Sequence, residues 1–321
     1  MSKRQVTGRQ AARIKYKHQS YHQRINANSE QNLAQGLVIA RFAQDALIED
    51  ENNQRIRCSL RPDIDSLVAG DRVIWQRENE TQGVVVSRYP RESLLGRPDK
   101  SGTIKPVAAN ITQIMVVLAP KPEVSWTLLD SYLIIAEYLN ITASIVLNKA
   151  DLSCAAIQQT LLKLYEPLGY RVIVTSQLEK RRNIALLELL NEETSVFVGQ
   201  SGVGKSSIIS SILPHETEIA TSELSNNFGR HTTSNSIFYH LPTGGAIIDS
   251  PGVREFGLWH MPKDEITRCY REFQPFLTQC KYRNCNHCDT PGCAILKAVQ
   301  ENLISRTRYD NYVKISNQFA K

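Results

Sequence analysis

A glycine-rich segment at residues 199–206 has the residue types and spacing of a phosphate-binding loop. It reads Gly-Gln-Ser-Gly-Val-Gly-Lys-Ser and matches the pattern G-x-x-x-x-G-K-[ST]. Glycines let the backbone curl until successive N–H groups face phosphate oxygens, Lys205 would reach the β- and γ-phosphates, and the Ser206 hydroxyl would bind Mg²⁺. The apolar run Val196–Val198 before the loop and a helix expected over Ser207–Leu213 supply the required setting. The competing interpretation is a glycine turn without a ligand.

A second motif indicates which base accompanies those phosphates. Residues 148–151 read Asn-Lys-Ala-Asp and follow an apolar run. The Asp151 carboxylate can accept hydrogen bonds from N1–H and N2–H₂ of guanine, whereas adenine would leave it unpaired. Asn148 and Lys149 would brace the base and the phosphate loop. A backbone contact to guanine O6 is expected near Ser176, although the residue after it is Gln rather than the common Ala.

Two further segments would respond to the γ-phosphate. Asp249-Ser-Pro-Gly252 has D-x-x-G spacing, in which Asp249 would hold Mg²⁺ through a water and the Gly252 N–H would sense the γ-phosphate. The segment at residues 229–233 reads Gly-Arg-His-Thr-Thr and lies between the phosphate loop and this motif. A threonine there would complete the Mg²⁺ shell, as in switch regions, and the sequence does not choose between Thr232 and Thr233.

A cysteine cluster near the end of the chain has the composition of a metal site. Cys280, Cys285, His287 and Cys293 supply three thiolates and one imidazole, a closed tetrahedral Zn²⁺ set with no position left for a reacting water. Such a metal would be structural and would replace a core that a tail of about 60 residues can hardly build alone. Cys288 competes as the fourth ligand, and buried free cysteines are the plainer interpretation.

The segments that must position these motifs alternate apolar runs with helical periods. Gln113–Ala119 and Ser144–Leu147 are continuous apolar runs, typical of strands buried on both faces. The apolar spacing over Trp126–Leu139 predicts a helix between them. Further strands are expected at Arg171–Thr175, Ser195–Val198, Ile237–Leu241 and Ala246–Ile248. This alternation predicts a parallel, doubly wound α/β sheet.

The residues before this sheet predict a small barrel and a basic tail. Residues 36–105 carry short strand candidates with turn signals about every 8–12 residues, which fits an OB-like (oligonucleotide-binding) β-barrel and almost equally an SH3-like barrel. The candidates are Gly36–Phe42, Asp45–Ile48, Gln54–Ser59, Asp71–Gln76 and Gly83–Ser87. Pro90–Pro106 has the composition of a linker. Residues 1–35 predict a mobile tail, with a mitochondrial transit peptide as the alternative.

Charge is distributed unevenly along the 321 residues. The formal net charge of +6 equals that of residues 1–35, which hold seven Lys or Arg and one Glu. Residues 106–258 sum to −4 and residues 259–321 to +4. Basic ends around an acidic middle favour contact with a polyanion, while solvated tails are the plain alternative. No apolar run approaches membrane-spanning length and no signal peptide is evident, so we expect a cytoplasmic protein without a membrane partner.

Basic and aromatic residues alternate around the cysteine cluster and continue on the helices expected after it. This mixture suits contact with an RNA backbone and occasional stacking on bases, whereas solvated helix faces are the bland alternative. The residues concerned are Tyr270, Arg271, Lys281, Tyr282, Arg283, Lys297, Arg306, Arg308 and Lys314.

The order of the nucleotide motifs is unusual. N-K-x-D precedes the phosphate loop and D-x-x-G comes last, whereas ordinary GTP-binding domains begin with the loop. This is the order of a circular permutation. Together with G-Q-S-G-V-G-K-S, G-R-H-T-T and D-S-P-G, it resembles the ribosome small subunit-dependent GTPase A family over about residues 36–321. The resemblance implies an OB-like barrel, a circularly permuted P-loop GTPase domain and a C-terminal α-helical zinc-binding domain. It also favours His287 over Cys288 as ligand.

The resemblance further implies a GTP hydrolase stimulated by the small ribosomal subunit and acting late in the maturation of that subunit. Its partners would be GTP, GDP and the subunit's rRNA, and we expect a monomer. Val253 stands where Ras-like proteins carry a water-positioning Gln, so intrinsic hydrolysis should be slow. By analogy with the family, His231 would position the attacking water. The alternative function is an RNA-binding assembly checkpoint factor in which GTP sets affinity and hydrolysis is incidental.

These interpretations define the expected domains and sites. The domains are a basic tail (1–35), an OB-like barrel (36–105), a permuted GTPase domain (106–258) and a zinc-binding domain with C-terminal helices (259–321). The predicted catalytic residues are His231, Lys205, Thr232 and Thr233. The predicted GTP-binding residues are Asn148, Lys149, Ala150, Asp151, Ser176, Gly199, Gln200, Ser201, Gly202, Val203, Gly204, Lys205, Ser206, Ser207, Asp249 and Gly252. The predicted metal ligands are Cys280, Cys285, His287 and Cys293 for one structural zinc ion, and Ser206 and Asp249 for Mg²⁺ bound with GTP.

Overall fold

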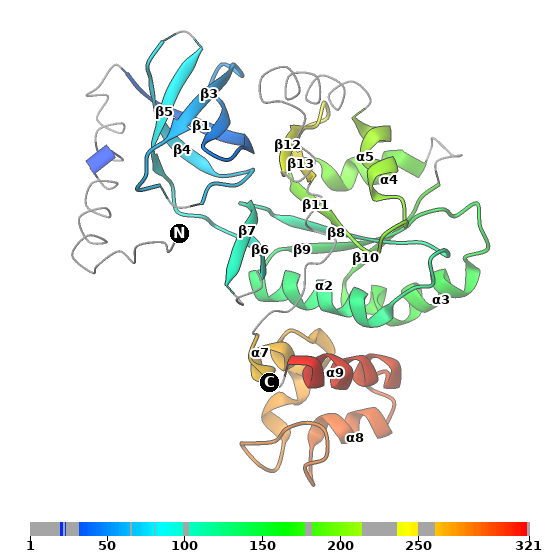
Figure 1. Ribbon diagram of the computed structural model, residues 1–321. Helices are drawn as coiled ribbons and strands as arrows, with labels where there is room; N and C mark the ends of the chain where they lie inside the picture. The colour runs from blue at the N-terminus through cyan, green and yellow to red at the C-terminus, as the bar shows by residue number, and fades with distance from the viewer. Residues whose placement is uncertain are drawn as a thin grey trace.

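The computed structural model arranges the chain as a barrel, a large sheet covered by helices, and a helical C-terminal part (Figure 1). Most of the expected basic tail lies outside the part of the chain that it describes, as do both segments expected to respond to the γ-phosphate, apart from Asp249. The described residues are 20, 21, 23, 32–64, 66–79, 81–98, 103–176, 182–213, 236–249 and 261–319. None of the helices within these ranges is both long and apolar enough to cross a membrane.

Five strands close into a barrel at the N-terminal side. They are β1 (Leu33–Arg41), β2 (Asp45–Glu49), β3 (Arg55–Leu60), β4 (Arg72–Arg77) and β5 (Gln82–Arg88). Their order is β1-β2-β3-β5-β4, and pairing of β1 with β4 completes the ring. Alternate residues such as Val38, Ile48, Trp75 and Val85 fill the interior. The five-stranded barrel predicted from the sequence is confirmed.

A six-stranded segment of the sheet carries the nucleotide motifs. Its strands are β8 (Gln113–Leu118), β9 (Thr142–Leu147), β10 (Arg171–Val174), β11 (Thr194–Val198), β12 (Ile237–His240) and β13 (Ala246–Asp249). Strands β10-β9-β8-β11-β13 are parallel. β12 runs antiparallel to β13, so the prediction of a wholly parallel sheet is wrong at this edge. A short loop joins β12 to β13, and hairpin-connected strands must be antiparallel.

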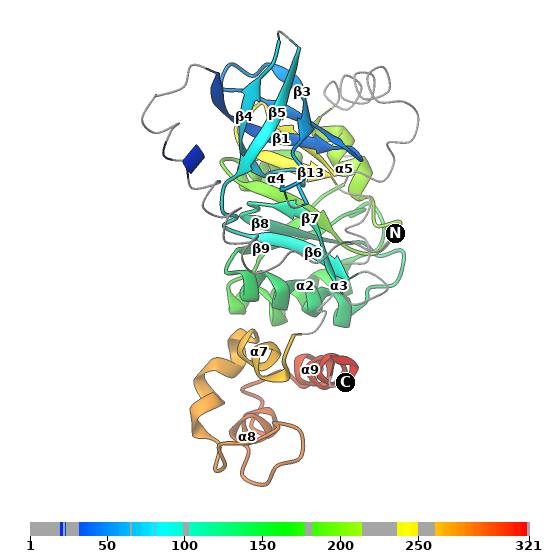
Figure 2. The same ribbon diagram turned by 60° about the vertical axis from the view of Figure 1, so that its left-hand side comes forward.

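The same β12 joins the sheet to the barrel. Ala40 of β1 pairs with Ile237 of β12 in antiparallel register, so barrel and α/β strands form one continuous sheet of 11 strands. Figure 2 shows the barrel above the layered α/β part, with β12 and β13 beneath it.

Helices cover both faces of the α/β strands. On one face lie α2 (Trp126–Leu139) and α3 (Ala155–Leu164), followed by the short 3₁₀ helix η1 (Glu166–Leu168). On the other lie α4 (Arg182–Leu190) and α5 (Lys205–Ile212). Buried side chains form a separate core on each side. The doubly wound layering is therefore confirmed, with α2 at the predicted bounds.

The segment expected to be a linker is a hairpin instead. β6 (Leu94–Pro98) and β7 (Ile104–Ala109) form a two-stranded antiparallel sheet that begins in the predicted linker Pro90–Pro106 and ends three residues beyond it. Proline is tolerated here because each strand of a two-stranded sheet has a free edge. Leu95 is fully buried and anchors the hairpin to the main core.

The C-terminal region, residues 261–319, packs against α2 on the side away from the sheet (Figure 1). It contains α7 (Lys263–Arg268), the 3₁₀ helix η3 (Arg271–Gln279), α8 (Ala294–Gln300) and α9 (Arg306–Phe319). Its small core is aromatic, with Tyr270, Phe273 and Tyr312 in mutual stacked and edge contacts. α9 lies along α2 and provides the main contact between this region and the α/β layers.

Candidate nucleotide site and metal centre

The phosphate loop, residues 199–206, connects β11 to α5. Gly199 and Gly204 have φ of +136° and +98°, a region that side-chain-bearing residues rarely adopt. A Cβ added to Gly199 would lie 2.2 Å from the carbonyl oxygen of Val117 on β8. The loop therefore packs closely against the carboxyl edge of the parallel strands, where open α/β sheets bind ligands.

The N-K-x-D segment braces this loop from the neighbouring strand end. The Asn148 side chain is buried, and its Nδ2 donates to the Val203 carbonyl at 3.0 Å. Lys149 Nζ donates to the Gly202 carbonyl at 2.6 Å. The two motifs, predicted separately from the sequence, thus lie together in the structure.

Lys205 lies folded over its own loop. Its Nζ donates to the carbonyl oxygens of Gly199 and Gln200, each at 2.7 Å. A Lys ammonium in this position is ready to exchange those carbonyls for phosphate oxygens.

Two hydroxyls, those of Ser176 and Thr175, contact side chains that the sequence predicts to bind guanine. Ser176 Oγ donates to Asp151 Oδ1 at 2.7 Å, and Thr175 Oγ1 donates to Asn148 Oδ1 at 3.2 Å. The Ser176 hydrogen bond lowers the pKa of Asp151, so this exposed carboxyl is ionised at neutral pH and ready to accept hydrogen bonds. The sequence predicts a backbone contact to the base near Ser176, whereas the contact seen here is made by its side chain, to Asp151.

Two hard oxygen donors lie at the same edge. Asp249 ends β13, which is the parallel neighbour of β11, and Ser206 is exposed in the first turn of α5. A carboxylate and a hydroxyl beside a phosphate loop are ligands that suit Mg²⁺. The other residues predicted to act on the γ-phosphate, His231, Thr232, Thr233 and Gly252, lie outside the described residues.

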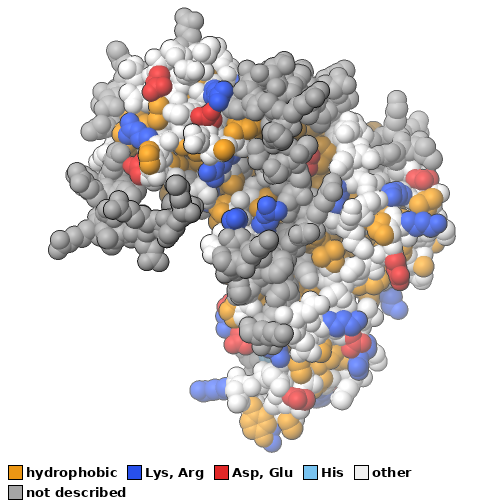
Figure 3. All heavy atoms as spheres, in the orientation of Figure 1, with side chains coloured by type: hydrophobic (Ala, Val, Ile, Leu, Met, Phe, Trp, Pro, Cys, Tyr) orange, Lys and Arg blue, Asp and Glu red, His pale blue; other side chains and the backbone are white. Residues whose placement is uncertain are grey.

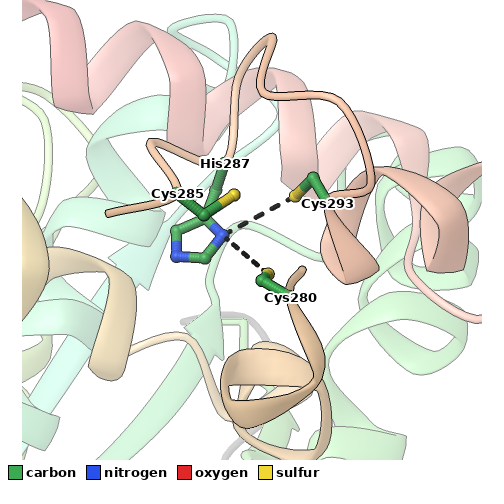
Figure 4. A group of neighbouring side chains, drawn as sticks. All are labelled: Cys280, Cys285, His287 and Cys293. Carbon is green, nitrogen blue, oxygen red and sulfur yellow. Dashed lines mark hydrogen bonds between the residues drawn. The ribbon is translucent and has the colours of Figure 1, made fainter. Parts of the chain in front are cut away.

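Cys280, Cys285, His287 and Cys293 turn their side chains toward a common point (Figure 4). Their ligand atoms all lie within 4.8 Å of one another, and His287 Nδ1 is 3.6 Å from the sulfurs of Cys280 and Cys293. Cys288 is not in this group, and its sulfur accepts from Lys263 Nζ at 3.5 Å. Three thiols and one imidazole at this separation fit the donor set and size of a zinc site.

The surroundings of the cluster hold these donors in place. The backbone N–H groups of Ala294 and Leu296, at the start of α8, donate to the sulfurs of Cys280 and Cys293. Burial lowers the pKa of His287, which favours the neutral imidazole that a metal requires. Such outer contacts orient the ligands before any metal arrives.

Comparison with known proteins places the chain in a family. A family model described as RsgA GTPase matches residues 88–259. The small ribosomal subunit biogenesis GTPase RsgA of Haemophilus influenzae is 42% identical over 336 residues, covering 100% of this chain and 97% of that protein. The RsgA 1 protein of Vibrio parahaemolyticus is 47% identical over 293 residues, covering 88% and 82%. The chain belongs to the RsgA GTPase family.

Solved structures of similar proteins agree with the RsgA assignment. YjeQ from Thermotoga maritima superimposes with a TM-score of 0.74 at 29% identity, covering 90% of this chain and 99% of that one. YloQ, described as a circularly permuted GTPase, gives 0.72 at 26% identity, covering 91% and 96%. The permuted motif order noted in the sequence is therefore a property that this RsgA chain shares with a known structure.

Two of the basic residues expected to contact RNA pair instead with acidic side chains of the same chain. The Arg308 side chain is 3% exposed and pairs with Asp130 and Glu272. Arg271 pairs with Glu137 of α2 at 2.7 Å. Arg308 is therefore too buried to contact RNA, whereas Arg271 keeps a half-exposed side chain. Exposed basic side chains remain on the surface of this region, in the lower part of Figure 3. They include Lys281, Arg283, Lys297, Arg306 and Lys314.

Proposed function

We propose that this GTPase is stimulated by the small ribosomal subunit and acts as a late maturation factor of that subunit. The chain is a GTPase of the RsgA family, and its relatives are named small ribosomal subunit biogenesis GTPases. The structural observation that supports the nucleotide part of the proposal is the hydrogen bonding of the phosphate loop to Asn148 and Lys149, with the ionised Asp151 beside them. This arrangement suits guanine and phosphates at one sheet edge.

In the proposed site, the loop N–H groups and Lys205 bind the phosphates, and Asp151 accepts from guanine. Ser206 and Asp249 would hold Mg²⁺, which neutralises charge on the phosphate oxygens when bound. His231 would position the attacking water, and Thr232 or Thr233 would close the site around the γ-phosphate. The supporting observation is the sheet edge itself, because it gathers the described members of this set.

Cys280, Cys285, His287 and Cys293 would hold one structural zinc ion in the C-terminal region. When bound, the ion supplies a fixed cross-link among loops that have few buried apolar residues. The exposed basic side chains near it would contact rRNA. The basic tail of residues 1–35 would form a second contact, with the barrel (36–105), GTPase domain (106–258) and zinc domain (259–321) between them. We further propose a cytoplasmic monomer.

The decisive experiment measures multiple-turnover hydrolysis of GTP and ATP while purified small subunits are titrated in. We expect slow GTP hydrolysis alone, strong stimulation by subunits, and no hydrolysis of ATP. Binding of subunits that depends on GTP without stimulated turnover would instead support the checkpoint factor. His231→Ala should keep GTP affinity and lose stimulated turnover. An unchanged stimulated kcat would remove His231 from the mechanism.

A further inference from the structure

The phosphate loop is tied to the start of α2 by one side chain. Gln200 Nε2 donates to the Glu123 carbonyl at 3.0 Å, and Gln200 Oε1 accepts from the Ser125 N–H at 3.1 Å. Ser125 is the N-cap of α2, and its hydroxyl accepts from the Leu128 N–H. Both polar atoms of the Gln200 amide are therefore used on the residues that begin this helix.

The first turns of α2 also contact α9 of the C-terminal region. Thr127 Oγ1 donates to Asn311 Oδ1 at 3.2 Å, and Asn311 Nδ2 donates to Asp130 Oδ2 at 2.7 Å. Asp130 also pairs with Arg308, and all of these polar groups except Thr127 are at least nine-tenths buried. Burial alone would lower the pKa of Arg308, but the carboxylates of Asp130 and Glu272 raise it well above its usual value. α9 is thus fixed to α2 by charges that are costly to separate.

The phosphate loop has a reason to change when nucleotide binds. Lys205 Nζ now donates to the carbonyls of Gly199 and Gln200. Phosphate oxygens carry more charge than carbonyls and would draw the ammonium to themselves. The Gln200 carbonyl then loses the hydrogen bond from Lys205, while the Gln200 side chain keeps its two hydrogen bonds to the residues that begin α2.

We propose that Gln200 is a positioning residue that couples phosphate occupancy to the C-terminal region through the first turns of α2. A change at the Gln200 peptide shifts the start of α2, and α9 follows because Thr127, Asn311 and the buried Asp130–Arg308 pair hold the two helices as one body. Affinity of the C-terminal region for the small subunit then depends on the nucleotide. This last step rests on the proposed function, whereas the helix coupling does not.

Hydrogen exchange of the full chain tests the coupling. Exchange of α9, residues 306–319, is compared without nucleotide, with GDP and with a non-hydrolysable GTP analogue. The native chain should show a nucleotide-dependent change in α9 of at least about fivefold in exchange rate. Thr127→Val keeps the side-chain shape but removes the hydrogen bond to Asn311, so it should reduce this difference while GTP affinity is kept, because the buried Asp130–Arg308 pair still joins the two helices. Gln200→Ala removes the link between the phosphate loop and α2 and should abolish the difference.

Thr160→Val is the matched control, because Thr160 on α3 bonds only within its own helix, to the Ala156 carbonyl, among the contacts described. It should keep the full nucleotide-dependent difference. A merely structural role of Thr127 would shift α9 exchange equally in every nucleotide state and leave the difference intact, which would overturn the proposal.

Nucleotide and subunit binding are measured in the same preparations. Unchanged α9 exchange in the native chain with nucleotide bound overturns the coupling and leaves the proposed function standing. Failure to bind GTP or small subunits contradicts the proposed function instead. With both intact, the ratio of subunit affinities in the GTP-analogue and GDP states should fall toward one in Thr127→Val, and an unchanged ratio would also count against the coupling.

Discussion

At the scale of single residues, the side chains expected to read guanine are held by hydroxyls from the next strand end. Ser176 binds Asp151 and Thr175 binds Asn148. Each hydroxyl fixes one acceptor and leaves the rest of the polar group available for the base. Such support reduces the ordering that a ligand must impose when it binds.

Asp151→Asn should weaken GTP binding by at least about tenfold, because the amide replaces a charge-assisted acceptor with a weaker one and presents a donor to guanine N–H groups. Fluorescence titration with a labelled GTP measures the change. Ser176→Ala, which keeps the carboxylate, should cost much less. Equal losses for the two variants would contradict the role given to the Asp151 carboxylate.

Cys285→Ser should reduce the zinc content of purified protein from one ion per chain toward zero, because a hydroxyl is a poor zinc ligand beside thiolates. Cys288→Ser is the matched control and should retain its zinc, since Cys288 contacts Lys263 rather than the other ligand atoms. Metal analysis after gel filtration gives the stoichiometry. Zinc loss in the Cys288 variant would indicate that Cys288, rather than His287, is the fourth zinc ligand.

At the scale of elements, hydrophobic periodicity was sufficient to predict the long buried helix and strands, but not how the strands pair. α2 occupies Trp126–Leu139 as predicted, because its apolar positions recur at the helical spacing. The hairpin of β6 and β7 was missed because its prolines and glycines have the composition of a linker. The strand β12 was predicted, at Ile237–Leu241, but its antiparallel direction was not, because a short strand has the same apolar pattern in either direction.

The same distinction between local patterns and distant pairings applies to the candidate site. Motif spacing made Asn148, Asp151 and Lys205 candidates for nucleotide binding, because nucleotide chemistry demands those residue types at fixed separations. The supporting contacts of Thr175 and Gln200 join residues far apart in the sequence, so no local pattern marks them. Arg308 shows the converse error. A basic residue on an expected helix resembled a surface contact, but the fold buries it against acidic partners.

Arg308→Met should destabilise the packing of the C-terminal region by about 3–5 kcal/mol, because it leaves Asp130 and Glu272 buried without their cation. Arg306→Met, on the same helix, removes an exposed pair with Asp310 and should cost less than about 1 kcal/mol. Urea unfolding of the full chain, followed by hydrogen exchange in α2 and α9, measures both. A similar loss of unfolding free energy in the two variants would show that the buried ion pairs of Arg308 add little to stability.

At the scale of the whole molecule, the net positive charge lies at the two ends of the chain. The α/β part is net acidic, and the C-terminal region loses Arg271 and Arg308 to internal ion pairs. Fewer basic side chains of the C-terminal region are therefore available to a polyanion than the sequence count alone suggests. This gives the tail a greater expected weight in contact with a polyanion.

Removal of residues 1–30 should weaken binding to small subunits and make it less dependent on salt, while GTP affinity is unchanged. Each lost phosphate contact should reduce the slope of log affinity against log salt by about 0.7–0.9. A full-length variant with the tail Lys and Arg residues changed to Gln separates charge from length. An unchanged slope in both variants would assign the salt dependence to the C-terminal region.

The pairing of β1 with β12 also has a consequence for the order of folding during synthesis. All five barrel strands are complete once the chain reaches Arg88, and each has its partners within the barrel. The end of β1, at Ala40, must wait for Ile237 before it joins the larger sheet. Closing so long a loop is slow, so the barrel should form early and dock late, when most of the chain has left the ribosome that made it.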